Sequence, residues 1–205
     1  MDRAERPFSQ ACENNKQPIL AVLERVLEGA SHVLEIGSGT GQHAVFFAAK
    51  LSHLVWQTSD LRESHAGIGA WLEHARLPNL REPLELDVTR EPWPLAAIGR
   101  VDAVFSANTA HIMPWPAVQA CVRGVGRLLP PGGRFLLYGP FHFGGRPTSE
   151  SNARFDASLR ARDPRMGVRS FEDVDREARA AGLALLEDCA MPANNRLLVW
   201  EREGP

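Results

Sequence analysis

Apolar residues recur along this chain at two spacings, one typical of amphipathic helices and the other of buried strands. A helix is predicted between Pro18 and Gly29, because proline favours the first turn of a helix and glycine its end. Its apolar positions follow helical spacing: Ile19, Leu20, Leu23, Val26 and Leu27. An amphipathic helix is therefore expected just before a glycine-rich turn at 37–41.

Strand and helix patterns alternate around and after that turn. Strand patterns occupy 33–36, 54–60, 83–88, 101–108 and 133–140, and helix patterns occupy 43–51, 63–75 and 117–129. Such alternation predicts a parallel sheet with helices on both faces, which is an α/β fold. Near the end, a helix at 171–182 is followed by strands at 183–190 and 195–202. Only the turn-rich segment MPANN joins these strands, so they should form an antiparallel hairpin.

The length of 205 residues fits a single domain, 1–205. Within it, 1–30 is expected to form an N-terminal arm and helix. Residues 141–170 contain two prolines, three glycines and six arginines and show no clear period. They are interpreted as an irregular lid or substrate-binding insertion.

Composition narrows the class of protein. Hydrophobic residues make up 44% of the chain and charged residues 23%, as in ordinary soluble proteins, and a net charge of -2 attracts neither nucleic acid nor an anionic membrane. The longest apolar stretches, such as AVFFAA at 44–49, are far shorter than the roughly 20 residues that cross a bilayer. The segment MDRAERPFSQ lacks an apolar signal-peptide core, so a cytoplasmic location is expected. The oligomeric state is not indicated.

Cysteine and histidine usage indicates neither a disulfide framework nor a metal site. Cys12, Cys121 and Cys189 are odd in number and far apart, with no C-x-x-C pair. The seven histidines form no ligand pair of the H-E-x-x-H kind. No metal is expected.

The segment VLEIGSGTG at 33–41 places Gly37, Gly39 and Gly41 directly after a predicted strand. Glycines there permit a sharp turn and close approach of the backbone to a ligand, so a nucleotide or nucleoside is expected at the strand ends. The dinucleotide fingerprint is G-x-G-x-x-G, whereas position 42 is glutamine here and the spacing is G-x-G-x-G. Glu35 would repel a pyrophosphate and attract a cation.

An acid two residues ahead of G-x-G-x-G resembles the first motif of the class I S-adenosylmethionine-dependent methyltransferases. The resemblance implies that S-adenosyl-L-methionine (SAM) is the cofactor and S-adenosyl-L-homocysteine (SAH) the product. Glu35 would lie near the amino group and sulfonium of SAM. The turn beside its methionine part would comprise Gly37, Ser38, Gly39, Thr40 and Gly41.

Two further acids fall at strand ends that this family uses. Asp60, followed by Leu61, would accept hydrogen bonds from the ribose hydroxyls about 20 residues past the turn. Asp87 would meet the adenine amino group while Val88 packs on the ring. Singly, each acid is equally well explained as structural: Glu35 with a partner inside the fold, the other two as caps. Together with the glycine spacing, they favour a cofactor site.

The family resemblance also implies the topology, a Rossmann-like doubly wound sheet of seven strands, mostly parallel with an antiparallel last strand. Segments spread over nearly the whole chain resemble a narrower group of methyltransferase-like proteins of unknown function: ENNKQPIL, NTAHIMPW, LLYGPF, SNARFDASLRARDPRMGVR and MPANNRLLVW. This resemblance supplies no substrate.

Candidates for contact with the methyl acceptor follow the fourth and fifth strands. Asn108 is expected at the ligand crevice, where it would contact cofactor or acceptor, and the segment SANTAHIM is not the N-P-P-Y type that acts on base or amide nitrogens. His111 would reach the same pocket, or else cap the helix beginning near Pro114. Tyr138 and His142 are further catalytic candidates, with a packing role for a hydrogen-bonded tyrosine as the alternative.

Two groups of polar residues have open interpretations. Asn15 and Lys16 would fold over the cofactor or simply be solvated. The arginines of the 141–170 insertion would bind an anionic acceptor through bidentate contacts, or form a solvated helix face with weak ion pairs. These arginines are Arg146, Arg154, Arg160, Arg162, Arg165 and Arg169, and the nearby acids are Glu150, Asp156 and Asp163.

The sequence therefore favours a SAM-dependent methyltransferase acting on a small molecule, with no nucleic-acid or membrane partner. A nicotinamide-dependent oxidoreductase of the short-chain type fits poorly, because Tyr138 is followed four positions later by His142 instead of lysine. A partner or sensor protein that binds SAM or SAH without turnover remains the main alternative.

Overall fold

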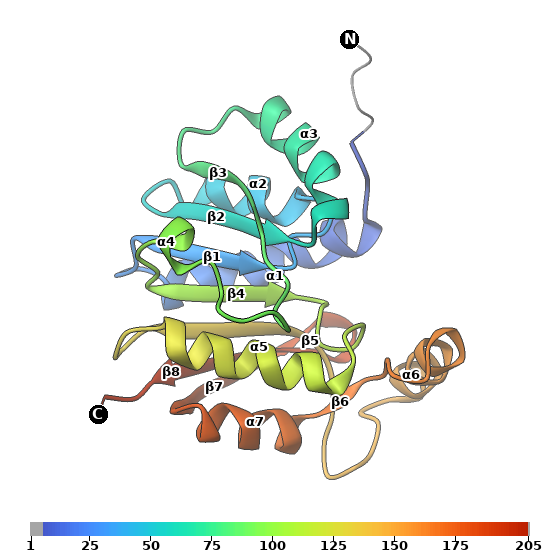
Figure 1. Ribbon diagram of the computed structural model, residues 1–205. Coiled ribbons are helices and arrows are strands. Elements are labelled where there is room, and N and C mark those ends of the chain that lie inside the picture. Colours follow the sequence, from blue (N-terminus) through green and yellow to red (C-terminus); the bar gives the residue numbers. More distant parts are fainter. Residues whose placement is uncertain (1–5, 205) are drawn as a thin grey trace. The chain divides into compact units, whose positions relative to one another are not determined.

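The computed structural model describes residues 6–204, in two compact units that meet in sequence at Phe105 and Ser106 (Figure 1). The first five residues of the expected N-terminal arm therefore lie outside the described residues. The strands are β1 (His32–Ile36), β2 (Val55–Asp60), β3 (Leu80–Glu85), β4 (Ala103–Ala107), β5 (Arg134–His142), β6 (Arg169–Ser170), β7 (Leu183–Met191) and β8 (Asn195–Arg202).

The strands pair in the order β3-β2-β1-β4-β5-β8-β7, with the two-residue β6 beside β5. The ladders joining β3, β2, β1 and β4 are parallel, whereas β8 is antiparallel to both β5 and β7. The expected fold class, a mostly parallel Rossmann-like α/β sheet whose last strand is antiparallel, is confirmed.

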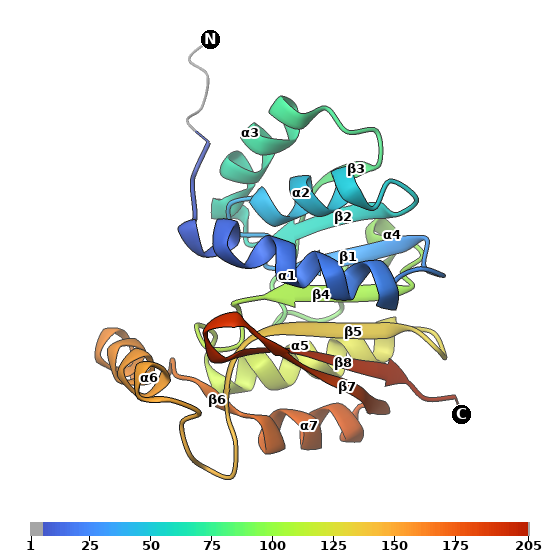
Figure 2. The same cartoon turned by 180° about the vertical axis from the view of Figure 1, so that it is seen from behind.

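The first unit contains α1 (Gln10–Val26), α2 (Gln42–Lys50), α3 (His65–Ala75), the short α4 (Leu95–Ile98) and a 3-10 turn at Arg62–Ser64. Helix α2 contacts both α1 and α3 (Figure 2). The core of the first unit includes Phe47 from α2, Trp56 from β2 and Phe105 from β4. All three are fully buried, and their ring centroids lie 5.5 to 5.9 Å apart. Burying each such ring contributes about 1.5–3 kcal/mol, so this cluster fixes α2 on the strands.

Helix α1 begins at Gln10, so the expected start at Pro18 was wrong. Ser9 is the N-cap, and its hydroxyl accepts a hydrogen bond from the Cys12 N–H at 3.4 Å. Pro18 lies inside the helix. A proline is compatible with the first turn of a helix but does not prove that a helix begins there. The Ser9 N-cap is the better signal for the start of α1.

Strand β3 spans Leu80–Glu85, three residues earlier than expected. The apolar alternation that suggested 83–88 includes Leu86 and Val88, which are buried but belong to the turn after the strand. β3 itself is half-exposed, because it is the last strand on its side of the pairing order. Asp87 therefore lies beyond the strand end.

The second unit contains α5 (Trp115–Leu128), α6 (Glu150–Arg162), α7 (Phe171–Ala180) and a 3-10 turn at Pro192–Asn194. The expected β7–β8 hairpin is confirmed. Phe135 of β5 stacks on Trp200 of β8 at 5.5 Å, and the Trp200 indole donates to Asp175 of α7 at 2.9 Å. These contacts hold α7 on the strands.

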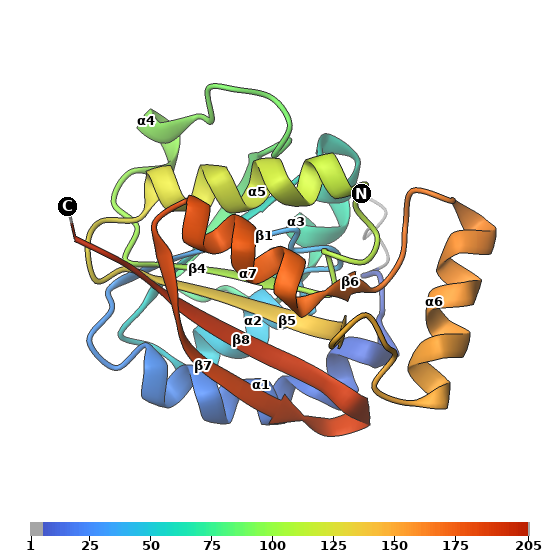
Figure 3. The ribbon, with the colours of Figure 1, turned by 90° about the horizontal axis from the view of Figure 1, so that it is seen from below.

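The segment 141–170 is not irregular throughout, because it contains the 13-residue helix α6. The Ser149 hydroxyl caps this helix by accepting a hydrogen bond from the Asn152 N–H at 3.1 Å. Its buried side chains are only Asn152 and Leu159, so the apolar period that usually reveals a helix is missing. Within the second unit, α6 stands apart from α5 and α7 (Figure 3). Among the described residues, no helix is both long and apolar enough to span a bilayer.

Candidate functional site

The glycine-rich turn joins β1 to α2 in the first unit. Gly37, Gly39 and Gly41 have φ angles of 73°, 57° and 87°, a region that other residues rarely adopt. A side chain at Gly41 would place its Cβ 3.1 Å from the Cα of Ile68, so this glycine lets α3 pack closely. A Cβ at Gly39 would meet nothing within 4 Å. The turn thus has one packed glycine and one that faces open space.

Glu35 lies directly beneath this turn and is 2% exposed. Its carboxylate accepts hydrogen bonds from the Ser38 hydroxyl at 2.9 Å and from the Trp56 indole at 3.1 Å. Burial raises the pKa of Glu35 to about 7, since the two hydrogen bonds offset only part of the lost hydration. Glu35 therefore has the structural partners that were considered, and it changes charge near neutral pH.

Asp60 ties the turn to the end of β2. One carboxylate oxygen accepts from the Gly39 N–H at 2.7 Å, and the other accepts from the Leu61 N–H at 2.7 Å. Each oxygen retains a second lone pair for a ligand hydroxyl. Leu61 is a large apolar residue with 42% of its surface exposed. The two residues together offer an acceptor and an uncovered apolar surface at this strand end.

Asp87 stabilises its own turn. Its carboxylate accepts from the N–H and the hydroxyl of Thr89, at 2.9 and 2.7 Å, and pairs with Arg90 at 3.2 Å. The hydrogen bonds from Thr89 hold the pKa of Asp87 below its usual value. Val88 is buried, and its carbonyl accepts from the Trp93 indole at 3.3 Å. The capping interpretation of Asp87 thus has direct support.

The start of α1 is joined to the start of α2. Asn15 is buried, and its amide oxygen lies 2.7 Å from Nε2 of His43, so it is not solvated. Burial lowers the pKa of His43 to about 4, and the imidazole is neutral at pH 7. Lys16 pairs with Glu13 and lies 5.0 Å from the centre of the Phe46 ring. These residues contact α2, the helix that follows the glycine turn, and so help to fix its position.

In the second unit, the loop after β4 carries Asn108 and His111. Asn108 has a φ of +60°, an unusual conformation at the end of a strand, and its N–H donates to the Tyr138 carbonyl at 2.9 Å. His111 is 7% exposed, and its ring meets that of Phe155 on α6 edge to face at 5.2 Å. Burial lowers the pKa of His111 to about 4, with the charges of Arg169 and Arg162 acting in the same direction. Its imidazole is therefore neutral at pH 7.

Arg169 holds this loop through backbone groups. Its guanidinium donates to the carbonyls of Ala110 at 3.0 Å, Arg165 at 2.9 Å and Met113. The Gly167 N–H also donates to the His111 carbonyl at 2.9 Å. The segment after α6 is thus fastened to the loop that carries His111.

Tyr138 and His142, the other two catalytic candidates, differ in setting. Tyr138 is 2% exposed within β5, which favours the packing role. Nε2 of His142 lies 3.8 Å from the Asp156 carboxylate, and its buried Nδ1 has no hydrogen-bond partner among the described residues. The structure thus connects His142 to α6.

The arginines of 141–170 are mostly engaged within their own segment. Arg160 pairs with Asp156 at 2.9 Å and Arg165 with Asp163 at 2.8 Å, so two of the six candidate arginines already have carboxylate partners. Arg154 pairs loosely with Glu150 at 3.6 Å. This arrangement fits the solvated face with ion pairs that was the alternative.

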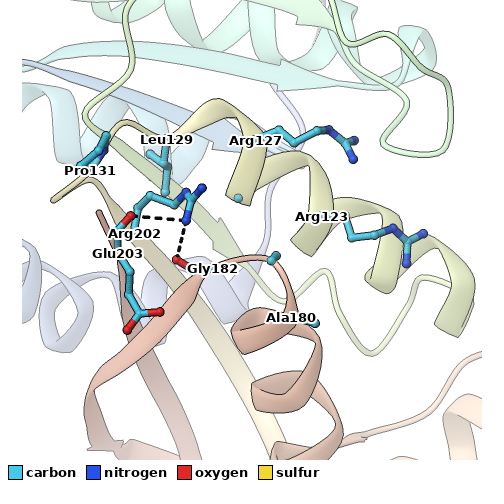
Figure 4. A pocket seen from close by; sticks show the side chains of 10 residues that line it. Arg123, Arg127, Leu129, Pro131, Ala180, Gly182, Arg202 and Glu203 are labelled. Carbon is cyan, nitrogen blue, oxygen red and sulfur yellow. Dashed lines mark hydrogen bonds between the residues drawn. The ribbon is translucent and has the colours of Figure 1, made fainter. Parts of the chain in front are cut away.

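The second unit also contains a cavity of about 600 Å³ near the C-terminal ends of α5 and α7 (Figure 4). Arg202 crosses it and donates to the carbonyls of Gly182 at 3.0 Å and Glu203 at 3.3 Å. Arg123 and Arg127 point outward from α5 (Figure 4). Arginines at helix C-termini complement the helix dipole, and none of the predicted site residues lines this cavity.

Several residues that build these regions were not anticipated. The indole of Trp56 was a foreseeable donor, since a buried tryptophan N–H needs an acceptor, but its pairing with Glu35 depends on strand register. Phe155 lay in the segment that was expected to be irregular. Among the described residues, no three His, Cys, Asp or Glu side chains are grouped to hold a metal, and none of the three cysteines forms a disulfide.

Comparison with known proteins adds two findings. The model of the family described as "Protein of unknown function (DUF938)" matches residues 6–202. Solved methyltransferases share the fold at low identity. An O-methyltransferase family protein from Burkholderia thailandensis is 18% identical, with a TM-score of 0.78 over 92% of this chain and 56% of its own.

Two further structures were solved with ligands. An O-methyltransferase family 2 protein from Planctomyces limnophilus, in complex with apigenin, is 18% identical, with a TM-score of 0.81 over 94% of this chain and 57% of its own. NcsB1, from neocarzinostatin biosynthesis, is an O-methyltransferase in complex with SAM and 2-hydroxy-5-methyl naphthoic acid. It is 15% identical, with a TM-score of 0.75 over 94% of this chain and 54% of its own. This chain thus spans little more than half the length of these structures.

Proposed function

This chain belongs to the DUF938 family of proteins of unknown function, and we propose that it is a SAM-dependent methyltransferase acting on a small-molecule acceptor. The observation that carries the proposal is the glycine turn: three glycines at positive φ follow β1, and Gly39, whose N–H donates to the Asp60 carboxylate, faces open space. The fold shared with SAM-dependent O-methyltransferases supports it.

The residues of the first unit fit this cofactor. The open face at Gly39 allows the backbone to approach the methionine part, and Glu35 complements a positive charge once it is ionised. Asp60 retains acceptor capacity for the ribose hydroxyls, and the exposed Leu61 offers apolar surface for the adenine ring. Asp87 and Val88, which are both engaged in their own turn, are assigned to the adenine end.

SAM supplies a methyl group already activated by the adjacent sulfonium. The protein then has to orient the acceptor, exclude water and give the acceptor's proton a destination. We assign acceptor contact to Asn108 and His111. Asn108 is held at φ +60° after β4, and His111 presents a neutral imidazole that can accept a hydrogen bond. Tyr138 and His142 are assigned supporting roles through β5.

A thermal-shift titration with SAM, SAH and NAD, confirmed by calorimetry, tests the proposal. A ligand at 100 times its dissociation constant stabilises by about 2.7 kcal/mol, which for about 200 residues raises the melting temperature by roughly 5 to 10 °C. SAM and SAH should produce the shift and NAD should not. A shift with NAD alone would overturn the assignment. Binding followed by no transfer of labelled methyl to any acceptor would favour the partner or sensor protein.

A further inference from the structure

His111 is a largely buried side chain whose imidazole makes a ring contact but no hydrogen bond among the described residues. It is 7% exposed, and no group among the described residues hydrogen-bonds its imidazole. Its backbone, in contrast, is fixed by the Gly167 N–H. The imidazole thus keeps hydrogen-bonding capacity that no protein group among the described residues uses, so a ligand or water can use it.

An apolar surface borders this imidazole. The Phe155 ring contacts His111 edge to face, yet 39% of Phe155 remains exposed. Ile112, the next residue along the loop, is 42% exposed. On the other side of the imidazole, a Cβ added at Gly139 of β5 would lie 3.7 Å from its Nδ1. A single hydrogen-bonding group is therefore surrounded by apolar surface and by a residue without a side chain.

Helix α6 holds Phe155 in place through the residues on the same face. The Asn152 amide donates to the carbonyl of Asn194, in the β7–β8 turn, at 3.2 Å. The Asp156 carboxylate accepts from the Val168 N–H at 2.7 Å, and Leu159 is buried. Phe155 is thus a half-exposed aromatic residue on a well-anchored helix.

The charges around His111 favour an uncharged ligand. Arg169 is occupied by three backbone carbonyls, and Arg160 and Arg165 are paired with carboxylates. Of these four arginines, only Arg162 has neither a carboxylate nor a carbonyl partner among the described residues, and its guanidinium contacts the sulfur of Met166 at 3.2 Å. Three of the four guanidinium groups are therefore already occupied by acceptors within the protein.

We propose that His111 and Phe155 form the acceptor subsite, and that the acceptor is a flat, uncharged apolar ring bearing a hydroxyl. The hydroxyl hydrogen-bonds the imidazole and the ring packs on Phe155, which is therefore a specificity-determining residue. As an acceptor assignment, this rests on the proposed methyltransferase function, but binding to the subsite can be measured without turnover.

The test uses 2-naphthol, cyclohexanol and 2-naphthoate as probes, with the full chain labelled at the histidine Cε1 position and its His111 signal assigned with H111N. 2-Naphthol should shift the His111 signal, and cyclohexanol, which lacks the flat ring, should bind at least tenfold more weakly. F155A should raise the dissociation constant of 2-naphthol at least fivefold. L186A removes an exposed apolar side chain from β7 of the same unit and should leave it unchanged.

Three results would overturn the subsite. The first is no shift of the His111 signal with 2-naphthol, and the second is an equal affinity of wild type and F155A for 2-naphthol. The third is that 2-naphthoate binds tenfold tighter than 2-naphthol and loses that advantage in R162Q. The last result would identify an anionic acceptor instead. Thermal shifts with SAM on the same samples separate the two proposals. A protein that binds 2-naphthol as expected but not SAM retains the subsite and loses the proposed function.

Discussion

The indole N–H of Trp56 donates a hydrogen bond to the carboxylate of Glu35 at 3.1 Å, inside the core of the first unit. A carboxylate placed there is held near the glycine turn at the cost of its hydration. Its pKa of about 7 is the result, and two measurable consequences follow from it.

The first consequence concerns stability. Because the folded-state pKa of Glu35 is raised, its contribution to stability is fully present below the unfolded value of 4.5 and is lost as pH rises through 7. Relative to E35Q, the wild-type free energy of unfolding should fall by up to about 3 kcal/mol over that interval. Urea denaturation at pH 5, 6, 7 and 8 measures this difference.

His43 and His111 act in the opposite direction in both proteins. Their lowered pKa values, about 4, mean that stability is lost as pH falls from 6.5 toward 4, so their effect cancels in the comparison of wild type with E35Q. E28Q alters an exposed glutamate and serves as the control. Parallel curves for wild type and E35Q would show that Glu35 titrates normally.

The second consequence concerns cofactor preference. SAM carries one more positive charge than SAH, so it should gain more than SAH from ionisation of Glu35. The preference for SAM over SAH should therefore increase between pH 6 and pH 8 by about fivefold, corresponding to about 1 kcal/mol of charge interaction. E35Q should remove this increase. Calorimetry with both ligands at each pH provides the measurement, and a pH-independent ratio would place the sulfonium away from Glu35.

Gly39 and Gly41 of the turn should respond differently to substitution. G41A introduces a Cβ 3.1 Å from the backbone of Ile68 at a φ of +87°, so it should lower stability by about 2–3 kcal/mol. G39A meets no protein atom within 4 Å and should cost only about 1 kcal/mol, for its left-handed conformation.

G39A should impair cofactor binding strongly even though it costs little stability. A methyl group at Gly39 occupies the space that the proposed ligand needs, so SAM affinity should fall at least tenfold although the protein remains folded. G69A, in α3 with no atom near its added Cβ, is the matched control and should be neutral or slightly stabilising. Unchanged SAM affinity in G39A would mean that the ligand does not approach this face.

Replacing Arg169 should loosen the loop that carries His111. R169K retains the charge but cannot reach the carbonyls of Ala110, Met113 and Arg165 with one planar group. Amide hydrogen exchange in peptides covering 106–114 should accelerate at least tenfold. R165K, which alters a surface pair with Asp163, should leave that exchange rate unchanged. Equal protection in R169K would show that the loop is held by other contacts.

The fold followed from the sequence because its signals were local. Val33, Leu34 and Ile36 make a short, mostly apolar strand pattern ahead of three glycines, and the hairpin followed from the short gap between the last two strands. The start of α1 and the extent of β3 were missed for a different reason. A proline fits a helix interior when packing compensates for it, and buried residues such as Leu86 can follow a strand instead of forming it.

The candidate site was only partly accessible from the sequence. The positions of Glu35 and Asp60 near the glycine turn follow from strand-end logic, but their partners Trp56 and the Gly39 N–H depend on register and on loop geometry. Phe155 was hidden because α6 has almost no apolar face, so the usual helical period is absent. Its meeting with His111 is a tertiary contact between distant segments, which no local pattern encodes.

The hold of Arg169 on the His111 loop is made entirely through peptide carbonyls. These hydrogen bonds do not depend on the side chains at Ile112 and Met113, provided that the backbone conformation is kept. Variation at these two positions can therefore reshape the surface beside the imidazole without releasing the loop. A designed library that changes only these two residues would therefore vary the ligands that the proposed subsite binds while the loop backbone stays in place.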